Sequence, residues 1–189
     1  MLKNLSKSIS YRRILLANDV ARSGFIKVYQ IAFAGPPYFE VYTDDDVEQG
    51  VWIPHVPHCI VVAKHDGHIV GFGCAHPILS GTSPNVQDFL EPHSGELPFD
   101  PSQTIYMSEL AVLDSHRRSG IGLELINQRF SWARENGFRT YLMRTAAEGS
   151  NSANIYLRLG AKRLPFLQDV QNEVTVSLSI HRQYLWGTL

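Results

Sequence analysis

Hydrophobic residues in the first part of the chain alternate between strand-like and helix-like spacing. The spacing predicts a strand over 9–16 and then a helix that begins at the polar pair 18–19. Gly35-Pro36-Pro37 ends this helix, because glycine and proline disfavour its continuation. Thr43 and Asp46 have the spacing of a capping box, so a second, short helix is predicted there. The apolar side chains of the first helix are Ala21, Phe25, Val28, Tyr29 and Ala32.

Two strand-like runs follow, at 59–64 and 69–75. Asp66-Gly67 lies between them and is a strong signal for a β-hairpin. The periodic pattern then stops from 76 to 103, where prolines, glycines and serines repeatedly interrupt the chain. A loop is therefore predicted over 76–103, and a loop of this length in a compact domain is usually functional or mobile.

The rest of the chain alternates strands with helices. Strands are predicted over 104–112, 141–144, 161–167 and 174–180, and helices over 120–136 and 150–159. The helix at 120–136 has the clearest apolar stripe, and Gly137 is a natural C-terminal cap for it. The order of elements is strand, two helices, three strands, helix, strand, helix and two strands. This order predicts one mixed α/β domain over 1–189.

The apolar positions of the strand at 104–112 change parity along its length. Ile105 and Met107 are odd-numbered, whereas Leu110 and Val112 are even-numbered. Because side chains alternate between the two faces of a strand, the change indicates an inserted residue, a β-bulge, near 108–110. The alternative is a central strand buried on both faces, for which parity carries no information.

Composition narrows the classes of partner. The 189 residues include 17 basic and 18 acidic ones, for a net charge of −1, which predicts no binding to nucleic acid or to an anionic membrane. Residues 1–10 lack the apolar core of a signal peptide, and no apolar stretch approaches about 18 residues. We therefore expect a soluble, cytoplasmic protein, in which Cys59 and Cys74 are buried free thiols.

The segment between the strand at 104–112 and the helix at 120–136 has the chemistry of an anion site. Its residues are Arg117, Arg118, Ser119, Gly120, Ile121 and Gly122. Glycines allow a tight turn and close approach of a ligand, and the free N–H groups at a helix start attract negative charge. Arginines add charge-assisted hydrogen bonds, so a pyrophosphate suits the segment. The alternative is a glycine-rich turn with solvated arginines.

Here the sequence resembles a known family. Leu110-Ala111-Val112 followed by Arg117-x-x-Gly120-x-Gly122 looks like the acetyl-CoA signature of the GNAT acetyltransferases, (Q/R)-x-x-G-x-(G/A). Downstream, Asn151-Ser152-Ala153, Tyr156 and Leu159-Gly160-Ala161 look like the family's second cofactor segment. The resemblance implies the GNAT acyl-CoA N-acyltransferase fold, a central mixed, splayed β-sheet of about seven strands flanked by helices. It also implies acetyl transfer from acetyl-CoA, as co-substrate, to an amine.

The resemblance also implies roles for individual residues. The backbone of Leu110, Ala111 and Val112 would hold the acetyl carbonyl and the pantetheine arm, and amides from Arg117 to Gly122 would hold the pyrophosphate. Asn151 would contact the pantetheine or pyrophosphate region. Tyr156 would lie beside the thioester sulfur.

The reaction needs a base and an acid. An amine with a pKa of about 10.4 is mostly protonated at neutral pH, so Glu109 is the candidate base, acting directly or through a water. The departing thiolate needs a proton, and Tyr156 is the candidate acid. The alternatives are a solvated or ion-paired carboxylate at Glu109 and a tyrosine at 156 that packs on the sheet.

The acceptor amine is left open among polyamines, amino acids, aminoglycosides and peptide N-termini, because loops form its expected walls. Tyr38, Phe39 and Trp52 either shape the acceptor pocket or belong to the core. The acidic run 44–46 either attracts a cationic acceptor or begins a helix. No metal site is expected, because the pairs His55-x-x-His58 and His65-x-x-His68 lack a full ligand set.

Two rival functions remain open at this point. One is an inactive CoA-binding regulatory module, and the other is an acyltransferase that uses a longer acyl chain. The exposed end of the last strand is also a candidate for pairing between subunits, so a homodimer is the expected assembly.

Overall fold

The computed structural model describes residues 8–36, 38–54, 57–80, 84–171 and 179–189. The strands are β1 (Ser10–Ile14), β2 (Cys59–His65), β3 (His68–Pro77), β4 (Thr104–Val112), β5 (Thr140–Ala146), β6 (Lys162–Gln171) and β7 (Ser179–Thr188). The helices are α1 (Arg22–Phe33), α2 (Asp44–Gly50), α3 (Pro84–Leu90), α4 (Ile121–Glu135) and α5 (Asn151–Arg158). Three 3-10 turns complete the elements: η1 (Glu91–Glu96), η2 (Pro101–Gln103) and η3 (Asp114–His116). None of the described helices is long and apolar enough to cross a membrane.

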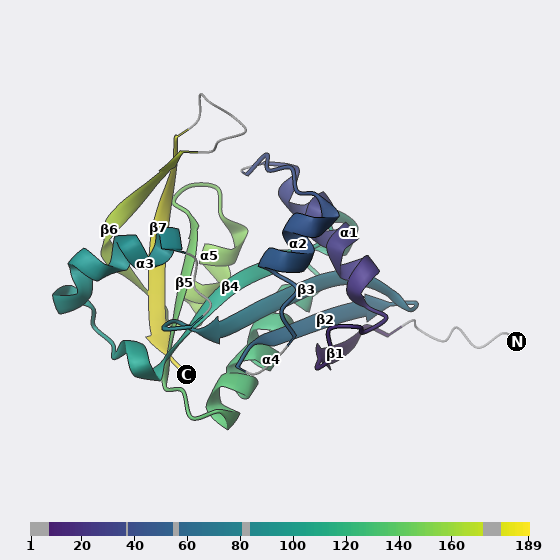
Figure 1. Ribbon diagram of the computed structural model, residues 1–189, viewed down its shortest axis with the longest axis horizontal. Coiled ribbons are helices and arrows are strands. Elements are labelled where there is room, and N and C mark those ends of the chain that lie inside the picture. Colours follow the sequence, from purple (N-terminus) through teal and green to yellow (C-terminus); the bar gives the residue numbers. More distant parts are fainter. Residues whose placement is uncertain (1–7, 37, 55–56, 81–83, 172–178) are drawn as a thin grey trace, which may run out of the picture.

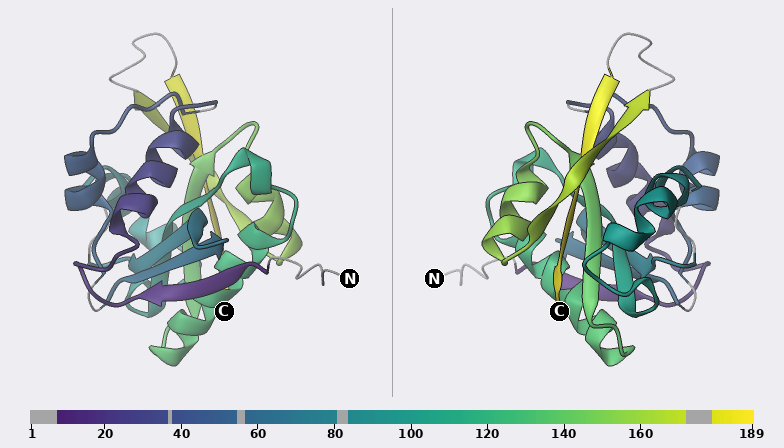
Figure 2. Two further views of the ribbon diagram at one scale, coloured as in Figure 1. Left: turned by 90° about the vertical axis from the view of Figure 1, so that its right-hand side faces the viewer. Right: turned by 90° about the vertical axis from the view of Figure 1, so that its left-hand side faces the viewer.

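The seven strands form one mixed sheet in the order β1-β2-β3-β4-β5-β7-β6. Neighbouring strands are antiparallel except β4 and β5, which are parallel. Helices α1 and α2 cover one face of the sheet, and α4 and α5 cover the other (Figures 1 and 2). This arrangement confirms the fold class that the resemblance implied.

The central strands part halfway along their length (Figure 1). β4 and β5 pair only over Thr104–Tyr106 and Thr140–Leu142, and their C-terminal ends diverge. On the other side of β4, the register with β3 shifts, because β4 advances from Tyr106 to Glu109 while β3 advances only from His76 to Cys74. β4 therefore carries an extra residue, which confirms the β-bulge that the parity change indicated.

A buried arginine of α4 fills the space behind this bulge. Arg129 is fully buried, and its Nη1 donates to the main-chain carbonyls of Cys74 and Glu109, each at 3.0 Å. Its Nη2 donates to the hydroxyl of Tyr156 at 3.1 Å, and its Nε donates to the carbonyl of Leu125 at 3.1 Å. Gly73 makes room for this side chain, because a Cβ at that position would lie 2.7 Å from Nε of Arg129.

Several predicted elements need correction. The prediction of an irregular loop over 76–103 is wrong, because α3, η1 and η2 lie within this range. The strand predicted over 161–167 runs on to Gln171. The strand predicted over 174–180 falls largely outside the described residues, and β7 continues to Thr188, well past its predicted end.

Other local predictions are confirmed. Thr43 and Asp46 form the capping box of α2, with the Asp46 amide donating to Oγ1 of Thr43 at 3.2 Å. Cys59 and Cys74 are buried free thiols.

The predicted start of the first helix is wrong. The polar pair 18–19 does not cap α1 directly, because Ala21 is the N-cap residue. Asp19 instead accepts from the Ala21 amide at 2.8 Å.

We predict that Gly73→Ala lowers the free energy of unfolding by about 1–3 kcal/mol, because the new methyl group overpacks the Arg129 guanidinium. Urea denaturation followed by circular dichroism measures the change. Gly50→Ala is the matched control, since nothing lies within 4 Å of a Cβ there. Equal stability of Gly73→Ala and the wild type would contradict the assigned packing.

Candidate active site

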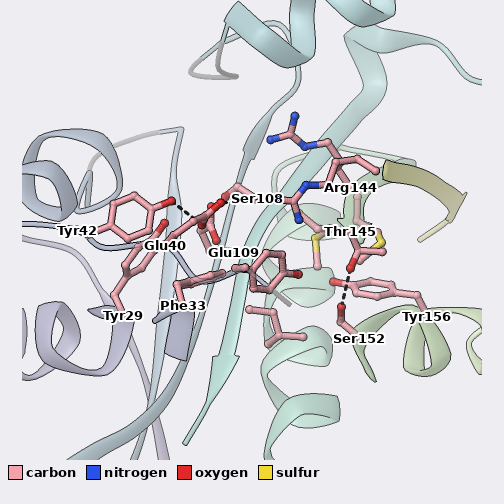
Figure 3. Close-up of a pocket in the computed structure, with 15 residues that line it drawn as sticks. Tyr29, Phe33, Glu40, Tyr42, Ser108, Glu109, Arg144, Thr145, Ser152 and Tyr156 are labelled. Carbon is pink, nitrogen blue, oxygen red and sulfur yellow. Dashed lines mark hydrogen bonds and ion pairs between the residues drawn. The ribbon is translucent and has the colours of Figure 1, made fainter. Parts of the chain in front are cut away.

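A pocket of about 130 Å³ opens where β4 and β5 part (Figure 3). It has room for several water molecules and combines side chains from both halves of the sheet with those of α1, α5 and the segment after α1. The lining residues are Tyr29, Phe33, Tyr38, Glu40, Tyr42, Met107, Ser108, Glu109, Leu110, Met143, Arg144, Thr145, Ser152, Tyr156 and Arg182.

One wall of the pocket is aromatic. The rings of Tyr29 and Phe33 from α1 lie 4.6 Å apart, and Tyr42 meets Tyr29 edge-on at 5.0 Å. The ring of Tyr38 lies 5.3 Å from that of Phe33. These rings form one wall of the pocket. Figure 3 shows Tyr29, Phe33 and Tyr42 on the same side as Glu40 and Glu109, with the Tyr42 hydroxyl donating to Glu40.

Glu109 is the carboxyl group at the bulge, and its surroundings raise its pKa above the value of a glutamate in water. Burial, and then the nearby carboxylate of Glu40, raise the pKa of Glu109 to about 7. Arg144, Arg182 and Arg129 act in the opposite direction. A group with a pKa near neutrality both accepts and releases protons under physiological conditions, which is what a general base requires.

Tyr156 of α5 projects into the same pocket from the opposite side. It is buried, and its hydroxyl oxygen accepts a hydrogen bond from Arg129. Burial raises the pKa of Tyr156 above its ordinary value, whereas the charge and hydrogen bond of Arg129 lower it. Since its oxygen accepts from Arg129, the phenolic proton is available to another acceptor.

The glycine-rich segment 117–122 has the backbone of an anion site. Arg118 (φ 61°) and Gly120 (φ 86°) are both left-handed, and Gly120 is the N-cap residue of α4 without a side-chain cap bond. The first amides of α4 therefore point outward without a side-chain partner. Arg117 is tied back, because its Nε donates to the Val112 carbonyl at 3.1 Å and its Nη1 lies 2.8 Å from Asp114.

The second predicted segment begins at α5. Ser150 caps this helix by accepting from the Ala153 amide at 3.2 Å, and its hydroxyl lies 2.6 Å from that of Thr145. Asn151 is exposed in the first turn, next to the cap residue. The hydroxyl groups of Thr145 and Ser152 also make contact at 3.3 Å, which ties α5 to β5 beside Tyr156 (Figure 3).

The structure brings some of the predicted site residues together and separates others. Glu109, Leu110, Tyr156 and Tyr38 line one pocket. Phe39 is not among the lining residues: it has a left-handed backbone with φ 52°, and 42% of its surface is exposed.

The backbone of the remaining β4 positions continues from the pocket toward α4. Val112 is partly buried beside the start of α4, and Ala111 is buried against the α1 side of the sheet. Of the two interpretations of Trp52, pocket wall or core, the structure supports the core. Its ring packs beside Phe25, and its Nε1 donates to the Ala17 carbonyl at 2.8 Å.

Four charged residues of the site were missed by the sequence analysis: Glu40, Arg129, Arg144 and Arg182. Arg129 left a signal, because it interrupts the apolar stripe of α4 between Leu125 and Phe130, where a charge needs buried partners. The other three follow no pattern that separates them from surface charges. Glu40 and Arg182 lie 142 positions apart, and only the fold brings them to one pocket.

Comparison with known proteins agrees with this architecture. A model of the acetyltransferase (GNAT) family matches residues 26–161, and the chain belongs to this family. No curated protein sequence matches the chain.

Solved structures superpose on nearly the whole chain. Arabidopsis thaliana NAA60, solved in complex with acetyl-CoA, has a TM-score of 0.69 and 16% identity, covering 96% of this chain and 99% of that one. The ribosomal-protein-alanine N-acetyltransferase of Brucella melitensis has a TM-score of 0.68 and 14% identity, with the same coverage of 96% and 99%. At these identities the superpositions show a common fold.

We predict that Glu40→Gln lowers the pKa of Glu109 from about 7, because removing the neighbouring negative charge favours the ionised carboxylate. Carboxyl-carbon NMR titration measures this pKa directly. Glu48→Gln is the control, since Glu48 is paired with Arg22 at the surface. A pKa that stays constant or rises in Glu40→Gln would contradict the assigned coupling.

Proposed function

We propose that the protein is an acetyl-CoA-dependent N-acetyltransferase that acetylates a primary amine by direct attack on the thioester. One observation carries the proposal: a carboxylate with a pKa near 7 and a buried tyrosine face the same pocket from opposite sides of a parted sheet. Residues Leu110–Val112 of β4 lead from this pocket toward the glycine-rich start of α4, where Val112 lies near Gly122, as an elongated cofactor requires.

The described residues fit acetyl-CoA, which supplies an acetyl group activated as a thioester. The outward amides at the start of α4 and the exposed Arg118 suit the pyrophosphate. β4 makes no ladder pairs with β5 beyond Tyr106, so the backbone of Leu110–Val112 is available to an extended ligand. An amide of this stretch would also stabilise negative charge on the reacting carbonyl.

Glu109 takes the proton of the acceptor amine in this mechanism. Its pKa of about 7 leaves a large fraction of the carboxylate ionised at neutral pH, while keeping it more basic than an ordinary glutamate. A base of this kind must be ionised to work, so kcat/KM should rise with pH through about 7.

Tyr156 supplies the proton to the departing thiolate. Arg129 donates to the phenolic oxygen, which leaves the phenolic hydrogen directed elsewhere and stabilises the phenolate that remains. Arg129 is thus a positioning residue, because it acts through the tyrosine and the bulge and does not line the pocket itself.

We predict that Gly120→Leu weakens CoA binding at least about tenfold, because a side chain then stands where the anion approaches the backbone. Isothermal calorimetry measures the affinity. Gly137→Leu is a matched control: Gly137 also has a positive φ of 84° and open surroundings, but it follows the opposite end of α4. Unchanged affinity in Gly120→Leu would refute the pyrophosphate site.

We predict that Tyr156→Phe lowers kcat by about 10²–10⁴-fold with little change in CoA affinity, because it removes the proton donor and leaves the start of α4 unchanged. Release of CoA thiol under single-turnover conditions measures the chemical step. Tyr141→Phe removes a hydroxyl from a buried tyrosine whose ring is 5.7 Å from that of Tyr156, and it should retain the wild-type rate. An unaltered rate in Tyr156→Phe would remove the acid role, and binding without any thiol release in the wild type would favour a regulatory module.

A further inference from the structure

Arg182 of β7 is a buried cation that lacks a close partner. Only 10% of its side chain is exposed, and it lines the pocket beneath the Tyr38 ring, whose centroid lies 4.8 Å from its guanidinium carbon. Its ion pair is with Glu40, with 3.5 Å between Nη2 and Oε1. Among the described residues, its Nε has no hydrogen-bond partner.

The contact with Glu40 leaves the Nε donor of Arg182 unsatisfied. A charge-assisted N–H···O bond spans about 2.7–2.9 Å, so the 3.5 Å contact is long. Glu40 also accepts a shorter hydrogen bond, at 2.8 Å, from the hydroxyl of Tyr42. A buried guanidinium whose Nε has no partner is costly, and a carboxylate that accepts from the guanidinium lowers that cost.

The charges around the pocket point to the same kind of ligand. Arg129, Arg144 and Arg182 all act on Glu109, and Glu40 is the carboxylate that opposes them. Arg144 donates to a neutral group, the side-chain oxygen of Gln168, at 3.0 Å. Among the lining residues, two arginines, Arg144 and Arg182, stand against two carboxyl groups, Glu40 and Glu109. A zwitterionic acceptor keeps this balance of charge, whereas a purely cationic acceptor would disturb it.

We propose that the acceptor is a free amino acid, whose carboxylate binds Arg182 while its amine faces Glu109. This assignment rests on the proposed acetyl transfer. The aromatic wall of Tyr29, Phe33 and Tyr42 then receives the side chain of the amino acid, which favours an apolar one. A peptide N-terminus lacks a carboxylate next to its amine and would leave Arg182 unmatched.

The experiment compares three acceptors that differ only in the group next to the amine. L-Leucine carries a carboxylate, L-leucinamide carries a neutral amide, and 3-methylbutylamine carries neither. We expect kcat/KM for leucine to exceed that for each of the other two by about 10-fold or more, the effect of a buried charge-assisted pair. The same comparison with phenylalanine, its amide and 2-phenylethylamine repeats the test with an aromatic side chain.

Arg182→Met keeps most of the side-chain volume and removes the charge. We expect this variant to lose the preference for leucine over leucinamide while its CoA affinity stays unchanged, and Arg182→Lys to retain part of the preference. The ratio of the two acceptors is measured within one protein sample, so it does not depend on the fraction that is folded. Arg22→Met is the control, because Arg22 pairs with Glu48 at the surface.

The outcomes separate this inference from the proposed function. Equal rates with all three acceptors, or a leucine preference that survives in Arg182→Met, would overturn the amino acid assignment while acetyl transfer stands. Acetylation of a peptide N-terminus in preference to every free amino acid would also overturn it. If none of the acceptors led to release of CoA thiol and the protein did not bind CoA, the proposed function itself would be overturned.

Discussion

The fold depends on satisfying main-chain carbonyls where the central sheet is interrupted. The bulge in β4 and its divergence from β5 remove ladder partners near Glu109, and Arg129 supplies hydrogen bonds to two of the carbonyls from behind the sheet. Each bond to a charged donor contributes about 1.5–3 kcal/mol, and an unmet buried carbonyl costs a comparable amount. Gly73 allows the guanidinium to reach this position, so the defect, the arginine and the glycine form one unit.

The same guanidinium links the fold to the chemistry of the pocket. Arg129 contacts the main chain of Glu109 and the hydroxyl of Tyr156, the two residues that we propose as base and acid. Its charge lowers the pKa of both side chains against the effect of burial. Burial without this charge would hold both groups in their neutral forms, which suits neither proton removal nor a stable phenolate.

Local patterns predicted much of the fold because the long elements repeat their signals. The stripe of α4 and the parity change in β4 were readable in this way. The seven-residue α3 was not, since Val86 and Leu90 are its only buried pair among the described side chains and prolines surround it. Motif resemblance located Glu109 and Tyr156, but Arg182 reaches the pocket through contacts across the whole chain, which no short spacing records.

The parted sheet explains why a site lies here at all. A continuous sheet satisfies its own backbone and offers a ligand only side chains, whereas the divergence of β4 from β5 leaves β4 unpaired with β5 beyond Tyr106. On the α4 side of the sheet, Arg129 is a permanent hydrogen-bond partner for the main-chain carbonyl of Glu109. On the pocket side, the ligand that we propose would complete these hydrogen bonds only when bound, and part of its binding energy would come from extending the sheet.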